Sequence, residues 1–512
     1  MAANLATDFA SSMRGLAVCV AGLGVSGPPA ARALAGMGAR VTAVDSRDDA
    51  ERGKIAHELA DLGVSVLLGD SAATTLPPGT GLVVTSPGWQ PDAPLLLAAA
   101  SAGVDVIGDV ELAWRLRPVQ PGSAQRWLAV TGTNGKTTTV RMLALMLAAA
   151  GYRSIAAGNV GTSLMDVVTE PEPYEVVAVE LSSFQLHWSS TIAPQAAALL
   201  NVAAHHLDWH GSFESYAADK AKIFVPGAVA IGNADDPWST RITQAAGRAG
   251  RAARVVMFSL GEPDRGQLGV AGGQLVDRAF GDGEEPVPLA AVGDLGLPAS
   301  PAGEQPLGRG GPEATDTSLS PANVRRPAPH NIANALAAAA LARSYGAPPE
   351  AVSAGLRAFR PEPHRIALVG NVAGVDYVDD SKATNPHAAA ASLAAYDQVV
   401  WVAGGLLRGA ERDLDQLVGA AAPRLRGVVL LGADRAKIAA ALGRHAPDVP
   451  VVEVTGPHTG IMELVVTAAA RLAEPGDTVL LAPAAQSFDM FRDYPARGDA
   501  FADAVRRLAA SR

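Results

Sequence analysis

The segment TGTNGKTT, residues 131–138, has the residue types that bind phosphate. Its glycines and small residues leave backbone N–H groups free to face an anion. Lys136 supplies a cation for the β- and γ-phosphates, and Thr137 or Thr138 supplies a hydroxyl for Mg²⁺. In the usual loop, G-x-x-x-x-G-K-[ST], a glycine stands where this chain has Val130. An ordinary capped helix start does not require Gly-Lys-Thr together behind a strand. We therefore interpret the segment as the phosphate loop of a nucleotide site.

Polar residues downstream of the loop indicate metal-assisted nucleotide chemistry, although each has an ordinary structural explanation. Glu180 closes the strand-like run VVAVEL and is a natural second ligand for Mg²⁺, but carboxylates at strand ends are often only solvated. The segment HHLDWH, residues 205–210, has a histidine spacing conceivable for zinc, while satisfied surface histidines are the commoner outcome. Lys220 and Lys222 follow on a predicted helix, and their spacing alone indicates surface lysines.

A second glycine pattern, GLGVSG at residues 22–27, lies between a predicted strand and a predicted helix. It satisfies G-x-G-x-x-G, and Asp45 ends the next strand, where an acid would hold a ribose hydroxyl. Taken alone, the pattern suggests a nicotinamide dehydrogenase. However, a helix N-terminus offers its N–H groups to any nucleotide diphosphate, UDP included, and no residues downstream indicate hydride transfer. A glycine turn without a ligand is the other alternative.

The elements that must position these residues alternate between strands and helices. Predicted strands at 17–21 and 41–44 flank a helix, another strand precedes the phosphate loop, and a helix follows it at 137–150. Such alternation predicts parallel sheets. The expected fold class is α/β with three doubly wound domains. They are a Rossmann-like N-terminal domain (residues 1–117), a P-loop-type central ATP-binding domain (118–361) and a Rossmann-like C-terminal domain (362–512).

Two stretches of the central block differ from the alternating pattern. Residues 261–281 are predicted to form a hairpin. Residues 297–326 are rich in Pro, Gly and Ser without a period, and we expect them to form a mobile insertion. The remaining strands expected in the central and C-terminal blocks are EVVAVEL, AAALLNV, GAVAIGN, RVVMFSL, VDYVDD, QVVWVAGG, GVVLLGA, PVVEVTG and DTVLLAP.

Composition limits the classes of protein to consider. The chain has 512 residues, 48% of them hydrophobic, which is enough for about three domains at ~150 residues each. A net charge of −10 argues against a general nucleic-acid binder. The single cysteine, Cys19, excludes an intramolecular disulfide framework and a cysteine-based zinc site. The N-terminal residues predict no signal peptide, and apolar stretches are interrupted before ~20 residues, so we expect a cytoplasmic protein without a membrane span.

The motifs, in their order along the chain, resemble those of the Mur ligase family, the ATP-dependent amide ligases of peptidoglycan precursor synthesis. TGTNGKTT is similar to the family's shortened ATP loop, which explains the missing glycine. ELSSFQL and DSKATN favour the members that add D-glutamate over their siblings. The likeness covers nearly the whole chain and is carried by TGTNGKTT, GNVGTS, ELSSFQL, HLDWHGS, YAADKAKIF, HNIANALAA, PHRI and DDSKATN.

The resemblance implies an ATP site with two Mg²⁺ ions. The catalytic residues would be Lys136, Glu180, His206 and Lys220. The ligands of the metal ions would be Thr137, Glu180, His206 and Lys220, the last as a carbamate. The contacts with ATP would come from Gly132, Thr133, Asn134, Gly135, Lys136, Thr137, Thr138, Asn331, Asn334, Arg365 and Asp380.

The resemblance also implies two substrate pockets. The UDP-sugar would contact Val25, Ser26, Asp45, Ser46, Arg47, Gly88 and Asn159. D-glutamate would contact Lys382, Thr384, Arg408, Ser487, Phe488 and Tyr494.

Three features depart from the family pattern. His205 stands where relatives often carry Asp, Arg408 stands where a lysine would bind glutamate, and the insertion at 297–326 has no clear counterpart. Arginine keeps the positive charge and can hold a carboxylate through two hydrogen bonds, so binding of glutamate at Arg408 is still expected.

The implied reaction joins D-glutamate to UDP-N-acetylmuramoyl-L-alanine through an acyl phosphate formed with ATP, and we expect the enzyme to be a monomer. Two alternatives stay open within the superfamily: another Mur ligase, or an amide ligase like folylpolyglutamate synthetase. A nucleotide-sensing module without catalysis is a third alternative, and the joint presence of Glu180, His206 and Lys220 argues against it.

Overall fold

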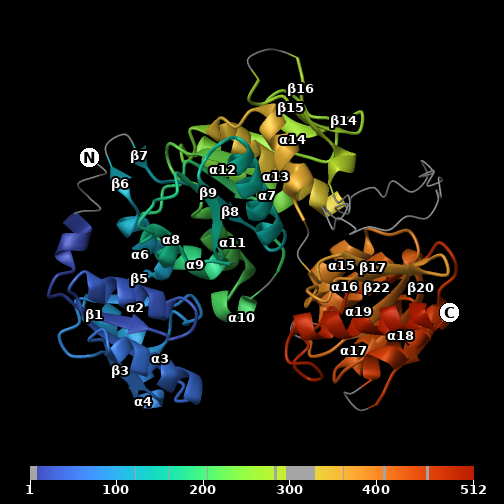
Figure 1. Ribbon diagram of the computed structural model, residues 1–512, viewed down its shortest axis with the longest axis horizontal. Coiled ribbons are helices and arrows are strands. Elements are labelled where there is room, and N and C mark those ends of the chain that lie inside the picture. Colours follow the sequence, from blue (N-terminus) through green and yellow to red (C-terminus); the bar gives the residue numbers. More distant parts are fainter. Residues whose placement is uncertain are drawn as a thin grey trace, which may run out of the picture. The chain divides into compact units, whose positions relative to one another are not determined.

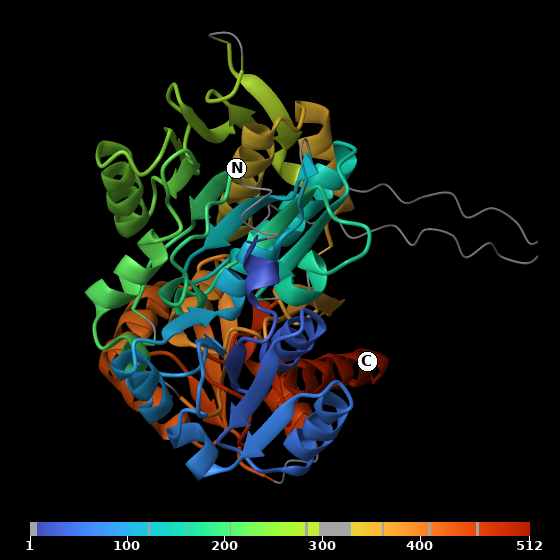
Figure 2. The ribbon, with the colours of Figure 1, turned by 90° about the vertical axis from the view of Figure 1, so that its left-hand side faces the viewer.

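Two compact units make up the described part of the chain. The computed structural model describes residues 8–120, 123–159, 161–204, 206–281, 285–295, 329–360, 363–407, 411–456 and 460–511. Of these, unit 1 comprises the residues up to 295 together with 331–359, and unit 2 comprises 329–330 and the residues from 360 onward. Unit 1 contains two large sheets and a two-stranded ribbon, whereas unit 2 contains one sheet. Helices flank the sheets (Figure 1, Figure 2), which confirms the α/β class.

The N-terminal sheet of unit 1 is parallel throughout. Its spatial order is β3 (Ser65–Leu68), β2 (Arg40–Asp45), β1 (Ala17–Ala21), β4 (Leu82–Thr85) and β5 (Asp105–Gly108). The apolar runs of the inner strands are buried on both faces, as a doubly wound sheet requires. The predicted strand–turn–helix–strand unit over residues 17–45 is confirmed. The helices are α2 (Gly27–Gly36), α3 (Ala50–Ala60), α4 (Asp70–Thr74), α5 (Pro94–Ser101) and α6 (Asp109–Leu116).

The second sheet of unit 1 is built around β8 (Arg126–Thr131), which precedes the phosphate loop. Its spatial order is β16 (Val287–Ala291), β15 (Gln274–Asp277), β14 (Gln267–Ala271), β13 (Arg254–Phe258), β12 (Val229–Asn233), β11 (Ala196–Leu199), β8, β10 (Val176–Glu180) and β9 (Ser154–Gly158). Neighbouring strands are parallel from β9 across to β14, and antiparallel from β14 to β16. The predicted hairpin is therefore confirmed as β14–β15, and β16 extends it by a strand that the sequence did not indicate.

The helices of the central sheet include the one that starts at the phosphate loop. This helix, predicted over 137–150, is confirmed as α7 (Lys136–Ala149). Residues 335–342 are buried, because a helix with alanine and leucine on every side lies inside the core. The other helices are α8 (Leu164–Val168), α9 (Ser183–His187), α10 (Leu207–His210), α11 (Phe213–Ala221), α12 (Pro237–Arg248), α13 (Pro329–Tyr345) and α14 (Pro349–Ala358).

Unit 2 contains a six-stranded sheet. Its order is β17 (Ala367–Val372), β18 (Val375–Asp379), β22 (Thr478–Leu481), β19 (Val399–Gly404), β20 (Leu425–Leu431) and β21 (Val451–Glu453). The five predicted strands are confirmed. The sixth, β17, is an antiparallel edge strand whose pairing with β18 is irregular between Leu368 and Gly370, and its glycine and asparagine obscure a strand pattern. The helices are α15 (Pro386–Leu393), α16 (Glu411–Ala421), α17 (Arg435–His445), α18 (Ile461–Leu472) and α19 (Tyr494–Ala510).

The described residues contain no helix with the length and apolar character that crossing a bilayer demands.

Glu111 on α6 ties the N-terminal part of unit 1 to the central part. Its buried carboxylate accepts hydrogen bonds from the backbone N–H groups of Ser190 and Thr191, each at 2.9 Å. Nε of Arg115 donates to the same carboxylate at 2.8 Å. Burial raises the pKa of Glu111, but the hydrogen bonds outweigh this effect and hold the pKa below its usual range. The charged carboxylate is therefore a structural link between α6 and the segment after α9.

Replacing Glu111 with alanine should lower the free energy of unfolding by roughly 3 kcal/mol, because buried donors lose their partner. Urea-induced unfolding of the full chain, followed by circular dichroism, measures this loss. Glu58→Ala is the matched control, since Glu58 is an exposed partner of Lys54 on α3 and its removal should cost less than about 1 kcal/mol. Equal losses in the two variants would contradict the role given to Glu111.

Candidate active site

The phosphate loop connects β8 to α7, and its conformation requires glycine. Gly135 has a φ of 85°, in the left-handed region, and a Cβ at this position would overlap Oδ1 of Asn334 on α13. The structure thus brings Asn334, a predicted ATP residue, against the loop from a distant part of the chain. Because α7 begins at Lys136, the positive end of its helix dipole lies at the loop and favours an anion there.

Two residues that the sequence reasoning missed hold the loop in place. Oδ1 of Asn201, just after β11, accepts hydrogen bonds from the backbone N–H groups of Thr133 at 3.1 Å and Asn134 at 2.9 Å. The hydroxyl of Tyr216 on α11 lies 2.9 Å from the hydroxyl of Thr133. A polar residue directly after a buried strand could have pointed to Asn201, whereas a tyrosine on a helix gives no such signal.

Two lysines converge on one carbonyl of the loop. Nζ of Lys136 donates to the carbonyls of Gly132 and Thr133, both at 3.0 Å, and Nζ of Lys220 donates to the Gly132 carbonyl at 2.8 Å. Lys220 is only 1% exposed, so the expectation from spacing that it is a surface lysine is wrong. Burial, with a further contribution from the charge of Lys136, holds the pKa of Lys220 well below its usual range.

Glu180 at the end of β10 is a buried carboxylate beside the loop. It is 2% exposed, so it is not a solvated strand-end charge. Its Oε2 accepts from the hydroxyl of Thr137 at 2.8 Å, and its Oε1 accepts from Nδ2 of Asn159 at 2.9 Å. Asn159, predicted near the UDP-sugar, therefore contacts a predicted metal ligand. A buried carboxylate and a hydroxyl are the hard oxygen donors that Mg²⁺ prefers, so this pair fits a magnesium ion.

His206, just before α10, has an exposed side chain and a strained backbone. Its φ of 54° is unusual for a residue with a Cβ, and such strain often marks functional sites. Its ring packs on Phe184 with 4.7 Å between the centroids. Across the described residues, no group of three His, Cys, Asp or Glu side chains could hold a metal ion. The predicted ligand set differs from such a group, because it includes a threonine hydroxyl and a lysine.

The predicted UDP-sugar residues of the N-terminal part follow neighbouring parallel strands. Asp45 ends β2, and its Oδ2 accepts from the backbone N–H of Leu23 at 2.7 Å, while its Oδ1 accepts from the N–H of Arg47 at 2.9 Å. A Cβ on Gly27 would overlap the carbonyl of Gly22, which explains the last glycine of the pattern. The carboxyl ends of β1, β2 and β4 bring together Val25, Ser26, Asp45, Ser46, Arg47 and Gly88.

Most of the predicted D-glutamate residues gather in unit 2. Lys382 and Thr384 follow β18, Ser487 and Phe488 follow the neighbouring strand β22, and Tyr494 begins α19. Nζ of Lys382 lies 5.3 Å from the ring centroid of Tyr494.

Arg497 supports these D-glutamate loops from within the fold, and sequence reasoning missed it. It is wholly buried, and its Nη2 donates to the carbonyl of Ser381 at 2.8 Å. Its Nη1 donates to the carbonyl of Ala485 at 3.1 Å. One arginine thereby joins the loop after β18 to the loop after β22.

Asp380, predicted to reach ATP, is buried at the end of β18. Burial raises its pKa to about 7, and the hydroxyl of Ser392 donates to it. Arg365, the other ATP residue predicted in unit 2, contributes a positive charge that acts in the opposite direction. His205, Arg408 and the expected insertion at 297–326 lie outside the described residues.

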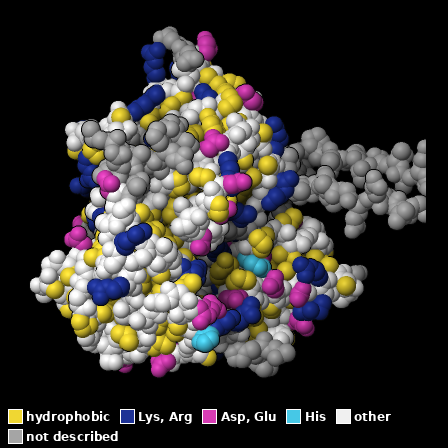
Figure 3. Space-filling model, turned by 60° about the vertical axis from the view of Figure 1, so that its left-hand side comes forward, with side chains coloured by type: hydrophobic (Ala, Val, Ile, Leu, Met, Phe, Trp, Pro, Cys, Tyr) yellow, Lys and Arg dark blue, Asp and Glu magenta, His cyan; other side chains and the backbone are white. Residues whose placement is uncertain are grey.

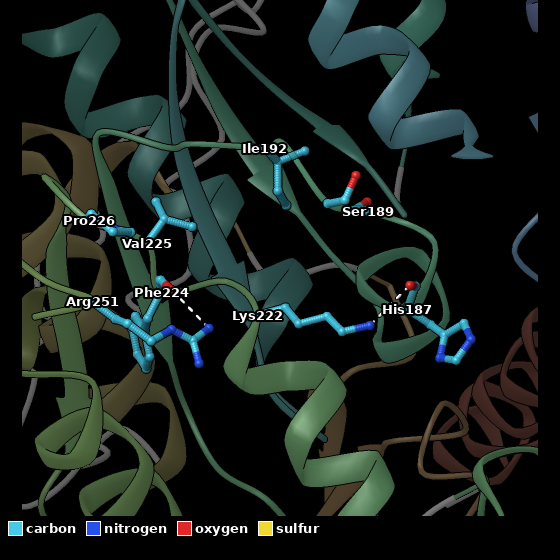
Figure 4. Close-up of a pocket in the computed structure, with 9 residues that line it drawn as sticks. His187, Ser189, Ile192, Lys222, Phe224, Val225, Pro226 and Arg251 are labelled. Atoms are coloured by element: carbon cyan, nitrogen blue, oxygen red, sulfur yellow. Dashed lines mark hydrogen bonds between the residues drawn. The ribbon is translucent and has the colours of Figure 1, made fainter. Parts of the chain in front are cut away.

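A separate pocket of about 450 Å³ lies beside α9 and the end of α11. Figure 4 shows the aliphatic chain of Lys222 extended across it. The pocket is lined by His187, Ser189, Ser190, Ile192, Lys222, Phe224, Val225, Pro226 and Arg251.

On the molecular face in Figure 3, basic and acidic side chains are interspersed.

Family models match all three sheet-containing parts of the chain. They are described as "Mur ligase MurD-like, N-terminal domain" at residues 17–108, "Mur ligase middle domain" at 130–274, and "Mur ligase, glutamate ligase domain" at 364–485. Together they span more than half of the chain, which agrees with three Mur-type domains.

Similar proteins cover almost the whole length. The UDP-N-acetylmuramoylalanine–D-glutamate ligase of Thermobifida fusca is 58% identical over 499 residues, 97% of this chain and 99% of that protein. The ligase of the same name from Streptomyces avermitilis is 56% identical, with 98% of this chain and 100% of that protein covered. The Mycobacterium avium ligase is 46% identical over 96% of each chain.

Solved structures of more distant proteins share the fold. A pseudomurein peptide ligase type C from Methanothermus fervidus matches with a TM-score of 0.52 and 16% identity over 96% of this chain and 100% of that chain. The UDP-N-acetylmuramate-alanine ligase of Thermotoga maritima matches with a TM-score of 0.50 and 18% identity over 97% of this chain and 100% of that chain. At these identities the likeness shows the fold alone. The near full-length identity to the named ligases shows more: this chain belongs to the Mur ligase family, among its UDP-N-acetylmuramoylalanine–D-glutamate ligases.

Proposed function

We propose that this chain joins D-glutamate to the L-alanine carboxylate of UDP-N-acetylmuramoyl-L-alanine, with ATP as the phosphoryl donor. The buried Thr137–Glu180 pair beside Lys136 is the observation that carries the phosphoryl chemistry. The choice of D-glutamate as acceptor follows from the name of relatives that match almost the whole chain. We retain the domain boundaries after residues 117 and 361, the monomeric state and the cytoplasmic location as predictions.

The proposed reaction overcomes the low reactivity of a carboxylate, whose charge repels an amine. One carboxylate oxygen of the alanine attacks the γ-phosphorus of ATP, the bond to the β,γ-bridging oxygen breaks, and ADP leaves. The amine of D-glutamate then attacks the carbonyl carbon of the acyl phosphate and loses a proton, and the tetrahedral intermediate expels inorganic phosphate. Catalysis of this kind rests on positioning and charge neutralisation, which Lys136 would supply at the phosphates.

The proposed site holds two magnesium ions. Thr137 and Glu180 would bind the first, and the hydrogen bond from Asn159 would orient the Glu180 carboxylate. His206 and a carbamylated Lys220 would bind the second. When bound, magnesium neutralises the charge that develops on the phosphoryl oxygens.

The surroundings of Lys220 support carbamylation. A carbamate forms when a neutral amine attacks CO₂ and releases a proton. Burial favours the neutral amine of Lys220, and the charge of Lys136 acts in the same direction. Nζ of Lys220 lies 2.8 Å from the Gly132 carbonyl, so the carbamate would stand next to the phosphate loop as an anionic ligand.

The remaining site residues are assigned by their place in the matched motifs. ATP would further contact the loop residues Gly132, Thr133, Asn134, Gly135 and Thr138, and Asn331, Asn334, Arg365 and Asp380. The uridine nucleotide would contact Val25, Ser26, Asp45, Ser46, Arg47 and Gly88. D-glutamate would contact Lys382, Thr384, Arg408, Ser487, Phe488 and Tyr494.

A panel of amino acids tests the acceptor. With UDP-N-acetylmuramoyl-L-alanine and Mg·ATP, D-glutamate should stimulate phosphate release at least roughly 10²-fold more than L-glutamate, because a site with fixed polar groups rejects a misplaced carboxylate. The measurement is phosphate release with mass analysis of the product, and omission of the UDP-sugar is the control. Greatest stimulation by another amino acid would point to a different Mur ligase, and turnover only with a folate would point to folylpolyglutamate synthesis.

A further inference from the structure

A buried carboxylate, Asp219, joins three short helices next to the phosphate loop. Its Oδ2 accepts hydrogen bonds from Nδ1 of His187 at 2.9 Å and Nδ1 of His210 at 3.0 Å. Its Oδ1 pairs with Nζ of Lys222 at 2.8 Å. Nε2 of His210 in turn lies 3.0 Å from the hydroxyl of Ser183. These five residues form the Asp219 cluster, and none of them is among the predicted site residues.

The hydrogen bonds determine the orientation of the His210 ring. An ionised carboxylate only accepts hydrogen bonds, so His210 donates its Nδ1 proton to Asp219. A neutral His210 then has an unprotonated Nε2, which accepts the hydroxyl proton of Ser183. The imidazole is wholly buried and stacks on Phe184, with 5.4 Å between centroids and 4° between planes. The ring is therefore held at both nitrogens and on one face.

The three helices of the cluster carry the surroundings of the proposed metal site. α9 begins three residues after Glu180, α10 begins directly after His206, and α11 contains Lys220 next to Asp219. Tyr216 on α11 connects the cluster to the phosphate loop. Its ring centroid lies 5.2 Å from the ring centroid of His210, and its hydroxyl contacts the hydroxyl of Thr133 in the loop. A change at Asp219 would thus reach several elements of the site.

We propose that Asp219 is a positioning residue, which by holding the three helices together preorganises His206 and Lys220 for the second Mg²⁺. The inference rests on the proposed function, since that function supplies the metal. Groups behind metal ligands typically change metal affinity or activity 10- to 100-fold when they are removed.

The number of donors around Asp219 fits this role. Its carboxylate faces three of them, on His187, His210 and Lys222. Asparagine has nearly the same shape, but its amide nitrogen cannot accept a hydrogen bond. Asp219→Asn therefore leaves at least one of the three donors without its partner.

One side of the cluster is open to substitution with little risk to the core. His187 and Lys222 line the pocket in Figure 4, where Nζ of Lys222 also donates to the carbonyl of His187 at 3.0 Å. His187→Gln removes the hydrogen bond to Asp219 and the ring contacts with Trp188 and Trp209. It leaves the buried His210 in place.

The test is a titration of the full-length protein with Mn²⁺ in the presence of a non-hydrolysable ATP analogue, followed by electron paramagnetic resonance. Asp219→Asn should bind Mn²⁺ about tenfold more weakly than the wild type. The Mg²⁺ concentration for half-maximal phosphate release should rise by a similar factor, while KM for D-glutamate stays unchanged. A merely structural role would not separate these two quantities.

Asp277→Asn, in the same unit of the chain, is the matched control. Asp277 at the end of β15 is also buried, and its Oδ2 accepts from Nε of Arg343 at 2.9 Å. The substitution removes a buried charge of the same kind, so it should lower stability and leave the Mn²⁺ affinity unchanged.

His187→Gln is the second variant and should weaken Mn²⁺ binding in the same direction, by a smaller factor. If Asp219→Asn folds and binds Mn²⁺ with wild-type affinity, the inference is overturned. If Asp219→Asn does not fold, wild-type Mn²⁺ affinity in His187→Gln overturns it instead. Absence of specific Mn²⁺ binding by the wild type would overturn it as well.

Failure of the proposed function is a distinct result. In that case the wild type binds Mn²⁺ and the ATP analogue but forms no amide with D-glutamate, and the titrations still decide the role of Asp219.

Discussion

Replacing Lys136 with alanine should lower the rate of phosphate release by about 10²- to 10³-fold. The lysine begins α7 at the phosphate loop, and its Nζ contacts the carbonyls of Gly132 and Thr133. In the proposed reaction this ammonium group moves onto the phosphates and stabilises charge that develops in the transition state. Since phosphoryl transfer leaves little covalent chemistry to the protein, loss of this charge removes a main catalytic contribution.

The measurement is phosphate release that depends on both UDP-N-acetylmuramoyl-L-alanine and D-glutamate. Lys437→Ala is the control, because Lys437 is half exposed on α17, paired with Asp434, and should leave the rate unchanged. Lys136→Arg keeps the charge but changes its geometry, so it should retain part of the activity. Near-normal turnover by Lys136→Ala would refute the assignment of the phosphate loop.

Replacing Lys220 with alanine should abolish most activity, by about 10²-fold, and a short carboxylate such as acetate should restore part of it. The side chain is buried against the loop, where a carbamate would act as an anionic ligand of magnesium. Alanine leaves space that a small carboxylate can fill. The rescue therefore reports on the anionic ligand, whereas a purely structural role of the lysine would give no rescue.

Carbon-13 NMR of the wild type with labelled bicarbonate provides a direct check. A carbamate signal should be present in the wild type and absent from Lys220→Ala. The rescue experiment uses chloride at equal ionic strength as the control for acetate. Loss of activity without rescue, together with absence of the carbamate signal from the wild type, would reject carbamylation and leave the ligase assignment intact.

The sequence predicted the regular parts of the fold well, because their signals are local. Residues that are close together in the sequence determine the strand at Ala17–Ala21, the glycine turn after it and the helix at the phosphate loop. Sequence reasoning missed β3, β5, β9, β16 and β17, which all lie at sheet edges. The pairing of an edge strand depends on its neighbouring strand, and all of these strands except β3 contain Pro, Gly or Asn, which weaken a strand pattern.

Residue spacing along the helix led to a wrong prediction for Lys220, which was expected to be exposed. Lys220 and Lys222 have the same local pattern, yet Lys220 is buried under the loop while Lys222 is partly exposed and pairs with Asp219. Only the resemblance to the Mur ligases singled out Lys220 in advance. Likewise, His210 was expected on the surface, but it is buried against Asp219.

By itself, the sequence determined the α/β class, the phosphate loop and membership of a ligase family, because these follow from short motifs and local periodicity. Only the tertiary structure decided that Asn334 reaches Gly135, that Arg497 joins two loops, and that Asp219 holds three helices. Each of these contacts joins residues from different elements. The free energy of burial and hydrogen bonding that favours them arises only when the sheets assemble, so no local pattern records it.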